Sequence, residues 1–545
     1  MIILAVDIGS SSVRCTAYTF SPPDTTINLH GACSKVLTPE FDENGQFDPQ
    51  ILRSSVEAAI TDCLSKISTE DIIVAIGFDC FAMSFVGSDA SGNAITKVFS
   101  YAERSESTAM YTDKLRRRLE LGNLTEATHQ RTGAPMHSAY AGPTLMRLLH
   151  EVPSLFDRVV CWQSFTSHLL QQWTAHTSII PVSYSEASWT GLFHRTSKCW
   201  DSELLSIIGM DDDMCSKLAP VADYDALPES LRLSPAMLDL WPKLSNARIF
   251  LGFGDGAMAN VGSKCTDASR VAVTVGTSAA LRVVIPSDRV EVVPPGLWCY
   301  AVDGELSLLG GALTDGGTIH AFLNKIFAME GVGEEEEQEQ EQEQEQEQEE
   351  RAVGCHGLVV LPFLGGERSP GWRDNARGTI HGMTRGTTSR DIQQAMYESV
   401  CLRLRSIMKL VSSYVEDEAI VLASGTALKS NPVWKQMMAD ALGKPLMVEE
   451  TSEDTSRGVT LMVVKSLLKK NMLVKEKLDM NIQIWTSTKS EAYGHELKKQ
   501  EELYRRLYKE EKSAESWLVG GYVVGASVVC GVVLGYALSY LRRKY

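Results

Sequence analysis

The sequence lacks any cysteine pattern typical of a zinc site or a disulfide framework. Its twelve cysteines are scattered, without a Cys-x-x-Cys pair or a neighbouring histidine cluster. We therefore expect reduced, mostly buried thiols in a cytosolic domain. A basic leader is also absent, because Met1-Ile-Ile-Leu-Ala-Val-Asp7 runs directly into a turn. This start predicts a first β-strand and no signal peptide.

The chain also lacks a basic stripe of the kind that binds nucleic acid. Its net charge is −17, and eleven glutamates between positions 334 and 350 account for most of it, which leaves −6 for the rest. We therefore expect no nucleic-acid partner. The Glu/Gln tract at 334–350 contains no apolar residue, so we expect a solvated loop or frayed helix. An acidic docking segment is the alternative.

A chain of 545 residues exceeds the size that one hydrophobic core usually supports, so we expect two domains. Apolar residues have helical spacing over residues 50–67, and an apolar run typical of a strand covers residues 71–78. Alternating strands and helices favour a doubly wound α/β architecture for a first domain at 1–252. The second domain is expected at 253–480.

Asp255 is the candidate for the chemistry of this protein. It follows an apolar, strand-like segment at 247–253 and lies between Gly254 and Gly256. Glycines permit close approach of a substrate, and a carboxylate at a strand end can take a proton from a hydroxyl group. The alternative is an ordinary Gly-Asp-Gly turn.

Two turns rich in glycine and hydroxyl residues are candidates for phosphate binding. Each follows a β-type run and precedes another, and backbone N–H groups in such turns can bind phosphate. The first contains Gly9, Ser10, Ser11 and Ser12, and the second contains Gly276, Thr277 and Ser278. Asp7, directly before the first turn, can hold Mg²⁺ through water. The recurrence suggests a duplicated domain that faces its twin across a nucleotide.

Several motifs together resemble the FGGY family of carbohydrate kinases, which belongs to the actin-like ATPase superfamily. The resemblance covers about residues 1–470. It includes the run at 378–398, which fits the long C-terminal signature of the family. The other motifs are Asp7-Ile-Gly-Ser-Ser-Ser-Val, Gly254-Asp255-Gly, Thr274-Val-Gly-Thr-Ser, Gly366-Glu-Arg-Ser-Pro and Ser424-Gly-Thr-Ala.

The resemblance implies two ribonuclease-H-like domains that close a cleft around a sugar and Mg-ATP. Asp255 then corresponds to the catalytic base and Asp7 to the acid associated with magnesium. The two Gly-hydroxyl turns correspond to phosphate loops. Gly425 and Ala427 correspond to the loop that contacts adenosine.

The substrate is indicated less directly. Segment Phe81-Ala-Met83-Ser84 stands where pentulose kinases of this family carry a Gln-Met-His-Gly-like run, and Arg104 stands one place early in a related pattern. Phe81, Met83 and Ser84 are nevertheless expected to contact substrate. The runs at 130–135, 185–191 and 296–300 resemble the gluconokinase-like subgroup. A sugar acid such as gluconate is therefore preferred, with Arg104 as the partner of its carboxylate. Arg104 as an ordinary surface residue, and a xylulose or ribulose kinase, are the alternatives.

Two other classes of protein compete with the kinase. A membrane-tethered, non-catalytic sugar or nucleotide sensor is disfavoured because Asp7, Asp255 and both phosphate loops are retained. An actin-like chaperone or filament protein is disfavoured by the sugar-kinase motifs. Turnover of a sugar by the purified protein would separate the kinase from both.

The C-terminal segment suggests a membrane anchor. Residues 517–541 carry no charge and, as a helix, would be long enough to span a bilayer. Residues 487–516 would form a charged stalk, with the kinase facing the cytosol. The tail resembles those sent to the mitochondrial outer membrane, with endoplasmic reticulum or peroxisome as alternatives. Glycines four residues apart also offer a face for a homodimer: Gly521 with Gly525, and Gly531 with Gly535.

Overall fold

The computed structural model describes residues 1–22, 26–175, 178–327, 351–448, 454–469 and 483–508. By its internal contacts the chain divides into one unit at 1–500 and a second at 501–545. The fold and the site described below lie within the first unit, which contains two large β-sheets and several two-stranded ones.

The first sheet has five strands in the order β11-β4-β1-β2-β3. Strands β1, β2 and β3 form an antiparallel meander, and β4 and β11 extend the sheet parallel to β1. Every residue of β1 is buried, because helices cover both faces of the sheet. The strands are β1 (Ile2–Ile8), β2 (Ser12–Phe20), β3 (Ile27–Leu37), β4 (Ile73–Cys80) and β11 (Arg248–Gly254).

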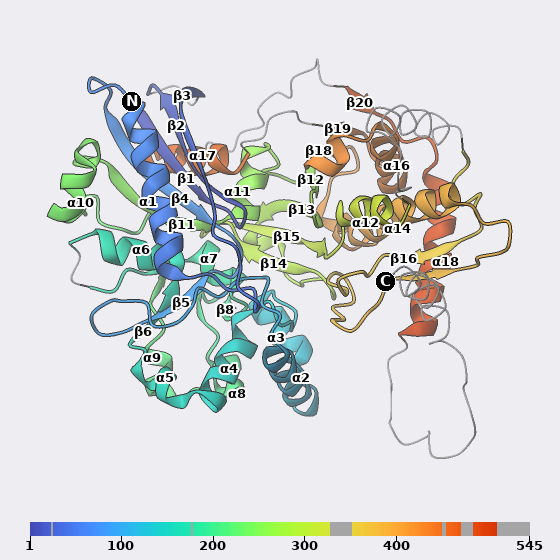
Figure 1. The fold of residues 1–545 in the computed structure, drawn as a ribbon, viewed down its shortest axis with the longest axis horizontal. Coiled ribbons are helices and arrows are strands. Elements are labelled where there is room, and N and C mark those ends of the chain that lie inside the picture. The colour runs from blue at the N-terminus through green and yellow to red at the C-terminus, as the bar shows by residue number, and fades with distance from the viewer. Residues whose placement is uncertain (23–25, 176–177, 328–350, 449–453, 470–482, 509–545) are drawn as a thin grey trace, which may run out of the picture. The chain divides into compact units, whose positions relative to one another are not determined.

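One face of this sheet is covered by α1 (Pro49–Ser65), in agreement with the helix predicted at 50–67 (Figure 1). The opposite face packs against α11 (Asp255–Gly262) and α17 (Asp454–Leu468). Gly77 of β4 permits this close packing, since a Cβ there would lie 2.8 Å from methyl groups of both Val459 and Val463 of α17. Helix α17 therefore returns from the far end of the sequence to complete the first domain.

The second sheet has seven strands in the order β14-β15-β13-β12-β18-β19-β20. Strands β12, β13 and β15 again form an antiparallel meander, with β18 and β19 parallel to β12. The strands are β12 (Arg270–Val275), β13 (Ala279–Pro286), β14 (Trp298–Ala301), β15 (Leu306–Leu313), β18 (Ile420–Ser424), β19 (Leu446–Val448) and β20 (Ile484–Trp485). The same topology as in the first sheet confirms the duplication predicted from the two turns.

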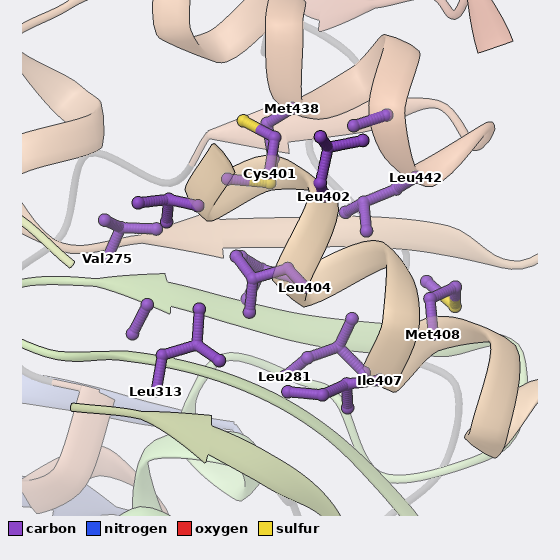
Figure 2. Close-up of a cluster of buried hydrophobic side chains, with 14 of the residues drawn as sticks. Val275, Leu281, Leu313, Cys401, Leu402, Leu404, Ile407, Met408, Met438 and Leu442 are labelled. Carbon is purple, nitrogen blue, oxygen red and sulfur yellow. The ribbon is translucent and has the colours of Figure 1, made fainter. Parts of the chain in front are cut away.

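The core of the second domain forms where α14 (Ser389–Val411) packs on this sheet, together with α12 (Thr318–Phe327) and α16 (Pro432–Leu442). Leu404 and Ile407 of α14 lie in one core cluster with Leu281 and Leu313 of the strands, and Cys401 lies near Met438 of α16 (Figure 2). A capping box between Thr388 and Asp391 explains why α14 begins at Ser389.

A large insertion separates β4 from β11 and forms much of the rest of the first domain. Its longer helices are α2 (Glu106–Leu121), α3 (Thr125–Thr132), α4 (Ala141–Glu151), α6 (Phe165–Trp173) and α8 (Ser202–Ile208). Its shorter elements are β5 (Phe85–Ser88), α5 (Pro153–Arg158), β6 (Cys161–Ser164), β7 (Val182–Ser183), α7 (Tyr184–Trp189), β8 (Phe193–His194), β9 (Cys199–Trp200), α9 (Asp212–Ser216), β10 (Val221–Ala222) and α10 (Pro235–Leu240). In the second domain β16 (Val359–Leu361), β17 (Thr379–His381) and α15 (Thr426–Lys429) connect the main elements.

The prediction of a C-terminal transmembrane helix is not supported. Across the described ranges, which end at residue 508, no helix is long and apolar enough to cross a membrane. The longest one, α14, carries charged residues such as Arg390, Glu398 and Arg403, which a bilayer core disfavours. The tail at 517–541, the glycines expected to support a homodimer and the tract at 334–350 lie outside the described residues. The membrane anchor, and with it the mitochondrial, reticular or peroxisomal location, is therefore withdrawn.

Part of the predicted stalk is a helix that packs on the second domain. Helix α18 (Ser490–Leu507) buries Tyr493 and Leu497 in the core of that domain. The Gln500 side-chain amide donates hydrogen bonds to the carbonyl groups of Val360 and Ser399. At least the first half of α18 is thus an integral part of the fold.

Candidate active site

A cavity of about 500 Å³ is lined by residues from both domains. One wall comes from the first domain and includes Arg14, Met83, Tyr101, Tyr140, Trp189 and Asp255. The other comes from the second domain and includes Thr274, Ser278, Arg282, Trp298, Tyr300, Arg368, Ser424, Gly425 and Lys429. The cavity therefore brings together residues that are far apart in the sequence.

Asp255 lines this cavity at the point where β11 ends and α11 begins. Its carboxylate accepts a hydrogen bond of 2.7 Å from the backbone N–H of Gly256. The absence of a Cβ at Gly254 is required, because such an atom would lie 2.3 Å from Nε1 of Trp189. Burial raises the pKa of Asp255 to about 6, and the nearby Asp7 adds to the rise, while the Gly256 hydrogen bond and Arg282 oppose it.

Asp7 lies beside a second carboxylate that the sequence analysis missed. Asp79 of β4 pairs in register with Asp7 of β1, and both side chains are buried. Asp7 accepts a hydrogen bond of 2.9 Å from Thr455 and lies 3.8 Å from Arg14. Neither oxygen of Asp79 has a hydrogen-bond partner among the described residues. Burial, and then the charges of Asp7 and Asp255, raise the pKa of Asp79 well above its usual value.

These carboxylates fit a divalent cation. Two adjacent acidic groups, one of them without a donor, leave negative charge that a cation would offset. Mg²⁺ commonly binds through one or two carboxylates and keeps several waters. No cluster of three or more acidic, histidine or cysteine ligands occurs in the part of the chain that the structure describes. The residues thus suit Mg²⁺ bound partly by water and substrate better than a closed protein cage.

The two predicted phosphate turns occupy equivalent positions in the two sheets. In the first, the Gly9 N–H donates to the carbonyl of Ser12 at 3.1 Å, and Tyr101 donates to the hydroxyl of Ser10 at 3.0 Å. Ser11 and Ser12 complete that turn. In the second, the Gly276 N–H donates to the carbonyl of Ser278 at 3.0 Å.

Only part of these turns reaches the cavity. Ser278 lines it directly, whereas the first turn adjoins it through Arg14 and Tyr101. Thr277, next to Ser278, accepts a hydrogen bond from the Thr318 N–H at the start of α12.

Gly425 lines the cavity between β18 and α15. Its φ of +98° is a conformation that glycine adopts readily, and a Cβ there would lie 2.3 Å from the Val275 carbonyl oxygen. Ala427, the second residue of α15, lies against Gly317. A glycine at position 425 therefore allows this loop to lie directly against β12.

The residues predicted to contact substrate do not all meet at the cavity. Met83 lines it, with a φ of +66°. Phe81 packs in the core of the first domain against Phe47, at 5.0 Å between ring centroids. Ser84 is buried, and its carbonyl accepts from the N–H of Phe165. The exposed Arg104 donates to the backbone carbonyl groups of Glu43 and Asp42 and does not line the cavity.

The cavity instead contains aromatic and cationic residues that were not assigned from the sequence. Trp189 stacks on Tyr300 at 4.4 Å between ring centroids, and Tyr300 stacks on Trp298 at 4.7 Å. The hydroxyl groups of Tyr140 and Tyr300 are hydrogen-bonded at 2.5 Å. These aromatics lie in or near runs quoted above as gluconokinase-like or family motifs, and Arg368 lies in Gly366-Glu-Arg-Ser-Pro. The sequence contained these motifs, but it did not show that they line the same cavity.

Comparison with known proteins identifies the family. Residues 2–262 match the N-terminal domain of the FGGY family of carbohydrate kinases, and residues 271–466 match its C-terminal domain. Gluconokinase from Bacillus subtilis (strain 168) is 24% identical over 464 residues, covering 84% of this chain and 86% of that protein.

Two solved structures support the same fold. A gluconate kinase and a ligand-bound xylulose kinase, both from Lactobacillus acidophilus, each superpose with a TM-score of 0.79 at 20% identity. Each comparison covers 93% of this chain and 98% of the other. This chain has the actin-like ATPase fold and belongs to the FGGY family of carbohydrate kinases, phosphotransferases that act on an alcohol group.

Proposed function

We propose that this kinase transfers the terminal phosphoryl group of Mg-ATP to a hydroxyl group of a sugar acid of the gluconate type. The main support for this proposal is the position of Asp255. Its carboxylate lines a cavity that Ser278 and Gly425 of the nucleotide-side loops also line. The gluconokinase relative and the cationic residues in the cavity support an acidic sugar as substrate.

In this mechanism Asp255 accepts the proton of the attacking hydroxyl. Phosphoryl transfer needs little covalent help from a protein, because positioning and charge neutralisation lower most of the barrier. The Arg282 side chain donates to Thr274 at 3.2 Å, and its charge acts on Asp255, so it can offset negative charge near the transferred group. Magnesium, held by Asp7 and Asp79, would supply further neutralisation of the phosphate charge.

The aromatic residues would bind the carbon skeleton of the substrate. Trp189 and Tyr300 come from different domains and form one stacked pair, which presents an apolar surface beside Asp255. Carbon-bound hydrogens of a sugar can pack on such a surface, and the same packing excludes water from the reacting hydroxyl. Exclusion of water favours transfer to the sugar over hydrolysis of ATP.

A pentulose kinase remains the second candidate, since the xylulose kinase superposes as closely as the gluconate kinase. Phosphorylation of a neutral ketopentose in preference to any acid would favour it. The non-catalytic sensor is not retained, because the chain belongs to a kinase family and keeps Asp255.

We expect the kcat/KM of the enzyme to rise with pH between about 5 and about 7. Asp255 must be ionised to accept a proton, and its pKa is raised to about 6. The ascending limb should therefore have its midpoint near this value, with a slope of one on a logarithmic plot. A rate profile measured with saturating Mg-ATP tests this, and an ascending midpoint near 4 would contradict it.

Substrate preference gives a separate expectation. A sugar acid should be phosphorylated with a higher kcat/KM than the neutral polyol of the same carbon chain, because its carboxylate can form charge-assisted hydrogen bonds. A coupled assay of ADP release over a panel of aldonates, polyols and ketopentoses measures this. Phosphorylation of neutral sugars alone would exclude the sugar-acid assignment and leave the kinase assignment intact.

A further inference from the structure

Arg368 is a cavity-lining cation whose charge is not paired with a carboxylate among the described residues. It is half-buried, and neither an ion pair nor a side-chain hydrogen bond joins it to another described residue. The adjacent carboxylate of Glu367 pairs with the buried Arg403 instead. Asp315, whose charge acts on Arg368, accepts hydrogen bonds from the Gly365 N–H at 2.9 Å and from Thr318 at 3.0 Å. The carboxylates around Arg368 are thus already engaged.

Two other cations of the cavity lie near acidic or hydroxyl groups of the protein. Arg14 lies 3.8 Å from Asp7, and Arg282 donates to Thr274 and is within the electrostatic influence of Asp255. A half-buried guanidinium has lost part of its hydration and is stabilised by an anion. Since no anionic group of the described residues is in ion-pair or hydrogen-bond contact with Arg368, the bound ligand is the natural source of that anion.

The surroundings of Arg368 place it at the aromatic part of the cavity. Its guanidinium carbon lies 5.7 Å from the ring centroid of Tyr101. Burial raises the pKa of the Tyr140 and Tyr300 hydroxyl groups, and the nearby charge of Arg368 opposes that rise. These two hydroxyl groups share one hydrogen bond, so one of their two protons remains available to a ligand oxygen. An anion bound to Arg368 would therefore also accept a hydrogen bond from one of these uncharged tyrosine hydroxyl groups.

A series of contacts connects Arg368 with the catalytic carboxylate. Gly256, directly after Asp255, adjoins the Trp189 ring, because a Cβ on it would lie 2.8 Å from that ring. Trp189 stacks on Tyr300, and Tyr300 lies within the electrostatic influence of Arg368. The stacked pair Trp189–Tyr300 thus adjoins Gly256, next to the proton acceptor, at one end and is influenced by the charge of Arg368 at the other.

We propose that Arg368 binds the carboxylate of an aldonic acid whose carbon chain lies along Trp189 and Tyr300 and whose distal hydroxyl group reaches Asp255. This inference rests on the proposed function and specifies its substrate as an acyclic sugar acid that is phosphorylated at the end remote from its carboxylate. Arg368 takes the role that the sequence analysis assigned to Arg104. The planar guanidinium can hold both carboxylate oxygens at once, which a neutral polyol cannot reproduce.

The experiment compares D-gluconate with D-glucitol, which has the same carbon chain without the charge. We expect Arg368→Gln to lower kcat/KM for gluconate by about 10–10²-fold, the usual effect of losing a charged hydrogen-bonded contact, with a much smaller loss for glucitol. The KM for ATP should not change. Arg104→Gln removes an arginine outside the cavity and is the matched control, expected to alter neither substrate.

Direct binding provides a second readout. Calorimetry with gluconate in the absence of ATP should show binding to the wild type and to Arg104→Gln. In Arg368→Gln the affinity for gluconate should fall by a factor similar to the loss in kcat/KM for gluconate. Arg368→Lys keeps the charge and should retain an intermediate affinity. If Arg368→Gln does not fold, Arg368→Lys provides the test. Its kcat/KM for gluconate divided by its kcat/KM for glucitol should be lower than the same ratio for the wild type.

The outcomes separate the two proposals. If the wild type phosphorylates gluconate and Arg368→Gln retains that activity, the role of Arg368 is wrong while the sugar-acid function stands. Equal losses on gluconate and glucitol, or a raised KM for ATP, would assign Arg368 to the phosphate groups or to the fold and overturn the inference. If the wild type neither binds nor phosphorylates any aldonate, the proposed substrate class fails, and this inference fails with it.

Discussion

The variant Asp255→Asn is expected to phosphorylate its substrate about 10²–10⁴-fold more slowly than the wild type, the usual effect of removing a general base. The amide matches the carboxylate in size and can still accept the hydrogen bond from Gly256 through its oxygen. It cannot accept the proton of the attacking hydroxyl. The loss should appear in kcat, with Mg-ATP binding measured by calorimetry nearly unchanged.

Asp239→Asn is the control for this variant, because it makes the same change at an exposed residue of α10 in the same domain. The melting temperature of Asp255→Asn provides a second check. Burial raises the pKa of Asp255 from its ordinary value to about 6, so ionisation of Asp255 reduces the stability of the fold as pH rises toward and through 6. At neutral pH the amide variant should melt no lower than the wild type. Turnover at the wild-type rate would exclude Asp255 as the base.

Gly425→Ala is expected to lower the free energy of unfolding by about 2–5 kcal/mol, which combines the cost of a positive φ with that of a steric clash. The new Cβ would lie 2.3 Å from the carbonyl oxygen of Val275, a backbone atom that cannot rotate away as a side chain can. The loop must therefore leave its position against β12. A displacement of about 1 Å in a substrate-positioning loop commonly costs about 10²-fold in rate, so kcat/KM for ATP should also fall sharply.

Gly386→Ala is the matched control in the same domain. Its φ is not in the left-handed region, and the nearest atom to a new Cβ is the hydroxyl oxygen of Thr384, at 3.8 Å. The free energy of unfolding of Gly386→Ala, measured by chemical denaturation, should lie within about 0.5 kcal/mol of the wild-type value, as for most exposed sites. Equal stability of the two variants would show that the close approach between Gly425 and Val275 is not required.

Local sequence patterns predicted the elements that carry the site. The helical spacing at 50–67 corresponds to α1, and the apolar run before Asp255 corresponds to β11, so Asp255 could be placed at a strand end from its neighbours alone. The repeated Gly-hydroxyl turns likewise predicted the duplicated sheets. The prediction of a membrane anchor relied on composition alone and is not supported by any described helix.

The choice of candidate substrate-binding residues depended on contacts between distant segments. Arg104 and Arg368 are chemically equivalent in the sequence, yet Arg104 contacts backbone carbonyl groups at the surface and Arg368 lines the cavity. Asp79 adjoins Asp7 only because β1 and β4 pair in parallel with this register.

The sequence by itself thus determined the family and the two similar sheets and predicted the candidate catalytic carboxylate, because apolar periodicity and short motifs are properties of neighbouring residues. The tertiary structure alone decided which cations and aromatics meet that carboxylate. Trp189 and Tyr300 come from different domains, and their stacking depends on how α11 and α17 pack between the sheets. Such packing is the sum of many long-range contacts, and no single segment of the chain contains it.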